Sequence, residues 1–320
     1  MSDSQVMKFE LHYFFSDDAH QMNAIVRHRC EGELLRIIEE ISNIMNINVI
    51  PQTEAYVEGG IKEIWSFAKR NRYVLGIATG VLINVLSNQI NIDREHINLQ
   101  KESLRLDIQQ KKFEIEKLKK EIEIGEPKAI ELMSDHLVFI LNNEYRVIRS
   151  RSDFYKNLQG YERITKISGQ QTNENNQPIS EPIVVERAQF GNFILSTDEL
   201  PIEIDEAASI EVVSPVLKKG KYKWRGIYKG SPIDFYMKDS EFKSAIFHQQ
   251  VSFTNGVSLD CVLVISKKMN EIGDIYVSSY SVATVISYHY GEETIETNQG
   301  KKYFRDKEFR NSQLKLFDKE

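Results

Sequence analysis

The stretch Tyr73–Ile90, YVLGIATGVLINVLSNQI, is the most apolar part of the chain, and the interpretation of its neighbours depends on it. The apolar segment 73–92 contains 20 residues and no charged side chain. At about 1.5 Å rise per residue, a helix of this length spans a hydrocarbon core of roughly 30 Å. A helix buried in a protein core has the same composition. We therefore consider both a membrane segment and a buried core helix.

One face of this predicted helix carries small and polar residues at four-residue spacing. Small residues at this spacing allow close helix–helix packing, while Leu82 lies on the opposite, apolar face. Basic residues flank both ends of the segment and no second apolar segment follows, so a permanent single span is disfavoured. A segment that is sheltered in one state and inserted in another satisfies both observations. We predict a membrane or oligomerisation role for Gly76, Gly80, Leu82, Asn84 and Asn88.

A long polar helix is predicted directly after the apolar segment, over residues 91–124. A stripe of mostly apolar residues, which includes Lys101 and Lys111, recurs at alternating steps of three and four, the period of a coiled-coil seam. We predict that this helix is a stalk and that the protein is a homo-oligomer. The residues expected to pair between copies are Leu104, Ile108, Ile115 and Leu118.

The remaining segments predict an α+β fold. Aromatic residues over 8–15 indicate a strand, the next segment to about Met45 has helical periodicity, and a strand follows around 47–57. Short β-branched and aromatic runs after about Ile183 indicate an antiparallel β-sandwich or barrel. The predicted divisions are a small α/β unit over 1–60, a helical region over 61–145, a connector over 146–182, a β-rich ligand-binding domain over 183–300 and a charged tail over 301–320.

A basic and aromatic segment lies within the predicted β-domain. Residues 212–233 contain no Asp or Glu, and KKGKYKWRGIYK packs six basic and three aromatic residues into twelve positions. Cations bind phosphates, and aromatic rings stack on bases at about 1–3 kcal/mol per base. A strand with core-facing aromatics and solvated lysines gives the same alternation. The candidate ligand-binding residues are Lys218, Lys219, Lys221, Tyr222, Lys223, Trp224, Arg225 and Tyr228.

Composition limits the other classes of function. The net charge of −6 excludes a uniformly basic nucleic-acid binder, and Cys30 and Cys261 are too far apart in sequence to suggest a CxxC site. His20, His28 and Cys30 lie near the first helix but lack the spacing of a metal site. No phosphate-binding, dinucleotide-binding or nucleophile-elbow motif is present. We therefore expect no enzymatic activity, no metal and no cofactor, and a reducing cytoplasm as the compartment.

The layout resembles the membrane effectors of bacterial anti-phage defence, most closely those of the Hailong systems. The resemblance rests on the apolar segment, on the long helix with LQKESLRLDIQQKKFEIEKLKKEI, and on KGKYKWRGIYKG in the β-domain. It implies an oligomer that is controlled by a nucleotide or single-stranded DNA oligomer, made by a partner nucleotidyltransferase. It also implies disruption of the inner membrane after activation. The alternative is a soluble structural or adaptor protein with a coiled-coil stalk and a protein-binding β-domain.

Overall fold

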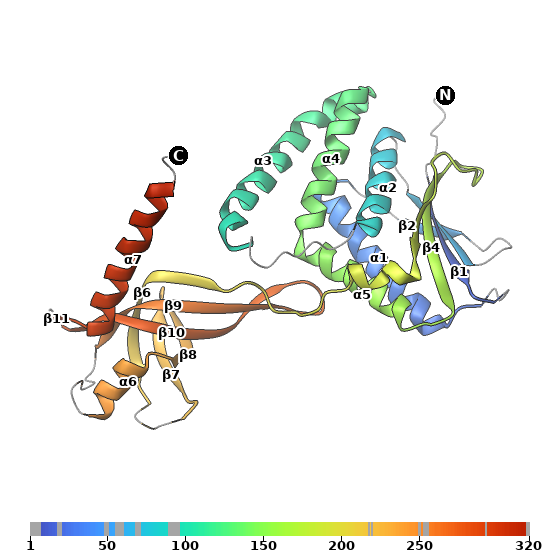
Figure 1. The fold of residues 1–320 in the computed structure, drawn as a ribbon. Helices are drawn as coiled ribbons and strands as arrows, with labels where there is room; N and C mark the ends of the chain where they lie inside the picture. The colour runs from blue at the N-terminus through green and yellow to red at the C-terminus, as the bar shows by residue number, and fades with distance from the viewer. Residues whose placement is uncertain are drawn as a thin grey trace. The chain divides into compact units, whose positions relative to one another are not determined.

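The chain divides into two compact units, each with its own hydrophobic core. Unit 1 consists of Met1–Asp198 and Met269–Asp274, and unit 2 consists of Glu199–Lys268 and Ile275–Glu320. Figure 1 shows the computed structural model. It describes residues 8–17, 21–47, 51–54, 61–67, 72–88, 97–216, 218, 220–248, 251, 256–291 and 293–317.

Unit 1 is built on an antiparallel sheet with the strand order β2-β3-β1-β4-β5. Phe9, Leu11 and Tyr13 are every second residue of the central strand and therefore lie on one face of the sheet, where all three are buried against the helices. The strands are β1 (Lys8–Phe15), β2 (Pro51–Glu54), β3 (Ile61–Phe67), β4 (Ile164–Thr172) and β5 (Ile183–Glu186).

Helices cover one side of this sheet, as Figure 1 shows. The first of them is preceded by the N-cap Asn23, whose side chain accepts hydrogen bonds from two backbone N–H groups, and is followed by the C-cap Asn46 in the left-handed conformation. The helices of unit 1 are α1 (Ala24–Met45), α2 (Arg72–Ser87), α3 (Ile97–Glu123), α4 (Pro127–Asn143) and α5 (Tyr145–Gln159), followed by the 3₁₀ helix η1 (Arg187–Phe193).

The division of the first half of the chain differs from the expected one. Residues 61–67 form β3 rather than a helix, because they pair with β1 on one side and β2 on the other. Residues 146–182, expected as a connector, contribute most of α5 and all of β4 to the core of unit 1. Since β1 also pairs with β4, the strands of the expected small α/β unit belong to a larger sheet.

The long helical stalk predicted from the sequence is wrong. The helix itself exists as α3, but Ile115 and Ile122 are buried in the core of unit 1, where α3 packs against α4. The His136 ring also contacts the Glu114 carboxylate, with 3.2 Å between Nε2 and Oε2. The apolar seam is therefore used within one chain.

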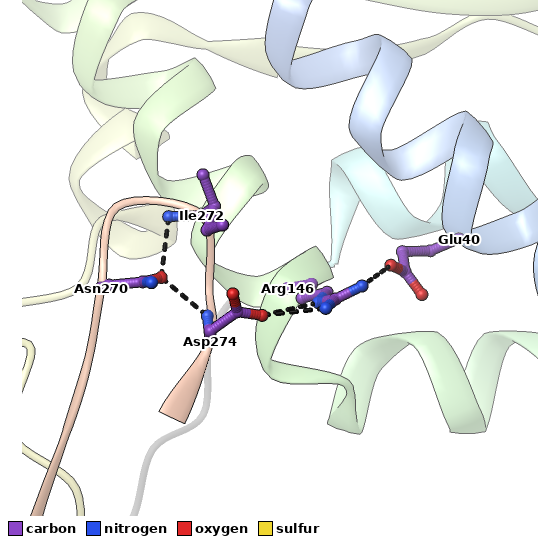
Figure 2. Close-up of polar contacts among 5 residues, drawn as sticks. All are labelled: Glu40, Arg146, Asn270, Ile272 and Asp274. Atoms are coloured by element: carbon purple, nitrogen blue, oxygen red, sulfur yellow. Dashed lines mark hydrogen bonds and ion pairs between the residues drawn. The ribbon is translucent and has the colours of Figure 1, made fainter. Parts of the chain in front are cut away.

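The short segment Met269–Asp274 also belongs to unit 1, and Figure 2 shows its polar contacts. Asn270 Oδ1 accepts hydrogen bonds from the backbone N–H groups of Ile272 at 3.0 Å and Asp274 at 2.8 Å, so the side chain closes the turn. Arg146 donates to Asp274 Oδ1 from Nη2 at 2.9 Å and to Glu40 Oε1 from Nη1 at 3.2 Å. These bonds join the turn to α5 and α1.

Unit 2 is a barrel with a mixed strand arrangement. The order β10-β8-β7-β6-β9 closes because β9 also pairs with β10, and β11 extends the ladder beyond β10. Of the predicted antiparallel sandwich or barrel, the barrel is confirmed, but β8 and β10 are parallel rather than antiparallel. The elements are β6 (Glu203–Ser214), β7 (Lys223–Tyr228), β8 (Ser231–Met237), α6 (Ser240–Phe247), β9 (Ser258–Met269), β10 (Ile275–Tyr290), β11 (Glu293–Glu296) and α7 (Asn298–Phe317).

Close packing inside the barrel fixes the orientation of β7. A side-chain Cβ at Gly226 would lie 2.6 Å from Ile210 Cγ2 and 2.8 Å from the Glu211 carbonyl oxygen, so only glycine fits there. The two-residue turn from β7 to β8 has positive φ at both Lys229 and Gly230, the arrangement of a type I′ hairpin. Such a short turn fixes which residues lie opposite one another on β7 and β8.

Candidate nucleic-acid interface

The outer surface of β7 and β8 carries pairs of residues that lie directly opposite each other. Lys223 is paired with Tyr236, and Arg225 with Asp234. Lys223, Arg225 and Asp234 are exposed, while Tyr236 is half-buried. The residues between them along each strand point into the barrel. The alternation along the strands therefore places the two basic residues of β7 beside the acidic and the aromatic residue of β8 on the same surface.

Four cations form what we call the basic face: Lys218, Lys221, Lys223 and Arg225. All four side chains belong to exposed residues, on β7 or on the segment that leads into it from β6. Among the residues that the structure describes, none of the four side chains makes a hydrogen bond or an ion pair. The nearby Lys229, in contrast, is held by Asp205, with 3.1 Å between Nζ and Oδ2. The basic face thus retains its charge for an external anion.

Two tyrosines lie beside these cations. The Lys223 ammonium is 5.3 Å from the centroid of the Tyr236 ring, which is cation–π geometry. Tyr222 has 48% of its surface exposed, and its ring packs closely against Gly220, which has a φ of +144°. A phosphate that draws Lys223 away would uncover the Tyr236 ring for stacking.

Two of the aromatic residues named from the sequence are not on this surface. Trp224 is only 2% exposed and packs against Phe235 in the barrel core, with 6.0 Å between ring centroids. Tyr228 is also buried, and its hydroxyl donates a 2.5 Å hydrogen bond to Asp205 Oδ2. Neither ring is accessible to a ligand on the outside, so we remove both from the candidate site. Lys219 lies outside the described residues.

Sequence reasoning missed Asp234 and Tyr236, the two β8 residues on this surface. The signal that identifies them is the dipeptide Lys229-Gly230, which lies between two segments in which polar and apolar residues alternate and therefore indicates a hairpin turn. With the turn placed there, Lys223 and Tyr236 are equally distant from it, and so are Arg225 and Asp234.

The residues predicted for membrane or oligomer contacts lie elsewhere, in unit 1. Leu82 is completely buried, and Gly76 and Gly80 face β4, where Gln171 Nε2 donates a 2.7 Å hydrogen bond to the Gly76 carbonyl oxygen. The small-residue face therefore packs on a strand of the same unit. Asn84 and Asn88, in contrast, are exposed.

The predicted oligomerisation seam is at least partly covered within unit 1. Ile115 is fully buried, Ile108 and Leu118 pack partly buried against the same core, and Leu104 is half-buried. Across the described parts of the chain, we find no helix that combines the length and the apolar character needed to cross a bilayer.

The end of the apolar helix α2 is capped by two buried side chains of α5. Arg151 Nη1 donates to the Val85 carbonyl oxygen at 2.9 Å and to Asn142 Oδ1 at 2.6 Å. Tyr155 Oη donates to the Leu86 carbonyl oxygen at 2.6 Å. These donors satisfy carbonyls that a helix end leaves unpaired. Burial lowers the pKa of Arg151 to about 10.

The polar residues Arg27, Cys30 and Glu63, on and beside α1, lie in or next to the core of unit 1. Glu63 is 1% exposed, and Arg27 Nε donates to its Oε1 at 2.9 Å. Burial raises the pKa of Glu63 to about 7, against the opposing effect of the Arg27 hydrogen bond. Burial also raises the pKa of Cys30 well above its ordinary value, so the thiol is unreactive. His28 lines a nearby cavity of about 340 Å³, while His20 lies outside the described residues.

No metal site emerges from this cluster. Within the residues that the structure places, no group of three or more His, Cys, Asp or Glu side chains is arranged to hold a metal ion. The basic face of unit 2 is therefore the arrangement with the clearest ligand chemistry. The chain matches none of the protein-family models, curated proteins or solved structures with which it was compared.

Proposed function

We propose that unit 2 binds single-stranded nucleic acid on the outer surface of β7 and β8. The observation that carries the proposal is the basic face, in which Lys218, Lys221, Lys223 and Arg225 are exposed and form no ion pair with another described residue. Four exposed cations that face one carboxylate, Asp234, in a chain with a net charge of −6 are a local asymmetry that favours a polyanionic ligand.

The geometry favours a single strand over a duplex. Outward residues on a strand recur about every 6.8 Å, so Lys223 and Arg225 can each contact a separate phosphate along an extended chain. Tyr236, and Tyr222 at the edge, supply ring surfaces on which unpaired bases stack. In a duplex the bases are already stacked on each other, and these rings would have no partner.

The topology of the barrel supports the same ligand class by analogy. A closed barrel of five strands, with a helix between its third and fourth strands, resembles the oligonucleotide- and oligosaccharide-binding fold. Proteins of that fold bind ligands on the second and third strands and on the adjoining loop between the first and second strands. In this chain those elements are β7, β8 and residues 215–222, which carry the basic face. The cations favour an oligonucleotide over a neutral oligosaccharide.

The test is fluorescence anisotropy with a labelled mixed-sequence 20-nucleotide single strand at several salt concentrations. With about four phosphate contacts, log K should fall with log salt with a slope of about −3. The variant Lys223→Glu with Arg225→Glu should lose at least about tenfold in affinity and flatten this slope. The matched control is Lys302→Glu with Arg305→Glu, which makes the same charge change at exposed positions of α7.

Equal loss of affinity in the two double variants would overturn the proposal, because binding would then depend only on net charge. A ratio of absorbance at 260 and 280 nm above that of pure protein after purification would support it independently. The wider role implied by the resemblance, with a ligand that controls membrane disruption by an oligomer, remains a prediction.

A further inference from the structure

The outer surface of β7 and β8 has two chemically different edges. The β7 edge carries Lys223 and Arg225, whereas the β8 edge carries Asp234 and Tyr236. Asp234 is exposed and lies directly opposite Arg225, yet no ion pair joins them in the described structure. Its carboxylate is therefore available as a hydrogen-bond acceptor at the border of the basic face.

This asymmetry orients the ligand of the proposed function. A phosphate backbone along β8 would bring its charges against the Asp234 carboxylate, and like charges at contact distance are unfavourable. The backbone is thus restricted to the β7 side, along Lys223 and Arg225. Bases that extend from a backbone in this position lie over β8, where Tyr236 offers a ring and Asp234 offers only acceptor oxygens.

The acceptor-only chemistry of Asp234 selects among the four bases. On its pairing edge, guanine has an N1–H and an N2 amino donor side by side, which match the two oxygens of one carboxylate. Cytosine and adenine present an amino donor next to a ring-nitrogen acceptor, and thymine and uracil present one N–H between two carbonyl oxygens. These acceptors repel a carboxylate, whereas the guanine edge binds it through two parallel hydrogen bonds.

We propose that Asp234 makes unit 2 selective for guanine at one position of a bound single strand, with Tyr236 stacking on that base. The inference rests on the proposed function, because it assigns a specificity residue to the same surface. A good two-bond contact to a base typically discriminates by about tenfold or more.

The experiment compares four labelled 13-nucleotide strands of thymidine that differ only at the central position, which is G, A, C or T. Wild-type protein should bind the strand with the central G about tenfold more tightly than the strand of T alone. Asp234→Asn should abolish this preference while it retains or improves binding of the T strand, because one acceptor oxygen becomes an amide donor and the negative charge is lost.

The matched control is Glu211→Gln, which removes an exposed carboxylate on β6, on the other side of β7. This variant should retain the guanine preference. Circular dichroism should give the same melting temperature for both variants and the wild type, since both positions are exposed.

The possible failures separate the two proposals. If the wild type binds all four strands equally, or if Asp234→Asn keeps the guanine preference, the assignment of Asp234 is wrong and the proposed function stands. If Glu211→Gln abolishes the preference, Asp234 is likewise not the residue responsible. If no strand binds at low salt, the proposed function fails, and the guanine preference fails with it.

Discussion

Replacing Glu63 by Gln should make unit 1 more stable at high pH and leave its stability at low pH nearly unchanged. Glu63 lies on β3 with its carboxylate buried beside Arg27, and burial raises its pKa from 4.5 to about 7. The folded state therefore binds the proton more tightly than the unfolded state. Stability from this group is fully present below pH 4.5 and is lost as the pH rises through about 7.

The size of the effect follows from the same two values. A pKa that changes from 4.5 to about 7 corresponds to about 3 kcal/mol between the fully protonated and fully ionised limits. Gln has the shape of the protonated acid and does not ionise. The Glu63→Gln variant should therefore exceed the stability of the wild type by about 1.5 kcal/mol at pH 5.5 and by about 3 kcal/mol at pH 8.5.

The assay is urea unfolding at a series of pH values, followed by tryptophan fluorescence. The chain has two tryptophans, and Trp65 lies in unit 1 while Trp224 lies in unit 2. A Trp224→Phe background thus reports on unit 1 alone. The control is Glu31→Gln, which removes the other carboxylate of Arg27, at 2.7 Å, and leaves Glu63 in place.

Other groups titrate over the same range, so the decisive quantity is the difference between variant and wild type at each pH. A difference that grows with pH for Glu63→Gln, and not for Glu31→Gln, supports the reasoning. If the Glu63→Gln difference is flat from pH 5.5 to 8.5, Glu63 is ionised in the folded protein throughout, and the argument from burial is refuted.

Three further substitutions test the packing. Gly226→Ala should destabilise unit 2 by at least about 2 kcal/mol, because the new methyl group would lie 2.6 Å from Ile210 Cγ2; the midpoint of Trp224 fluorescence in urea measures this. Gly32→Ala should stabilise unit 1 by about 0.5–1 kcal/mol, since nothing lies within 4 Å of the added Cβ inside α1, and a lower melting temperature would contradict it. Arg151→Met should cost about 2 kcal/mol, because the Val85 carbonyl loses its donor, and hydrogen exchange at the end of α2 should accelerate.

Some of these elements could be predicted from the sequence because local patterns determine them. The aromatic strand at residues 8–15 and the helix that ends at Met45 were found correctly. The segment Ile61–Phe67 was not, because Ile61, Ile64 and Trp65 fit helical spacing as well as a strand. Pairing with β1 and β2 decides between the two, and β1 precedes the whole of α1, so this pairing is not visible in the local sequence.

The candidate site could be predicted only in part, for a similar reason. Alternation along β7 indicates that Lys223 and Arg225 share a face, but it does not say which face is inside. Closure of the barrel settles this by placing Trp224 in the core, beside Phe235. The β8 residues come to the same surface through the Lys229-Gly230 turn, a signal that sequence reasoning left unused.

The seam of α3 shows why a heptad pattern does not by itself predict an oligomer. Steps of three and four specify a continuous apolar stripe on a helix, and any helix with a complementary surface can cover it. Ile115 and Ile122 meet α4 of the same chain, to which α3 is joined through the tight turn at Gly125, with a φ of +79°. A partner held this close in sequence has a far higher effective concentration than a second copy in solution.

The apolar segment illustrates the same limit for membrane prediction. Leu75, Ile77 and Ile83 lie on different sides of α2, and all three are almost completely buried. A helix that is covered on nearly every side needs an apolar surface all round, whether lipid or protein covers it. The C-terminal end of this helix distinguishes the two environments. Arg151 of α5 donates a hydrogen bond to the Val85 carbonyl oxygen there, and a lipid environment does not supply such a buried guanidinium. The residue that marks α2 as a core helix therefore lies 66 positions further along the chain, beyond the reach of any window on hydropathy.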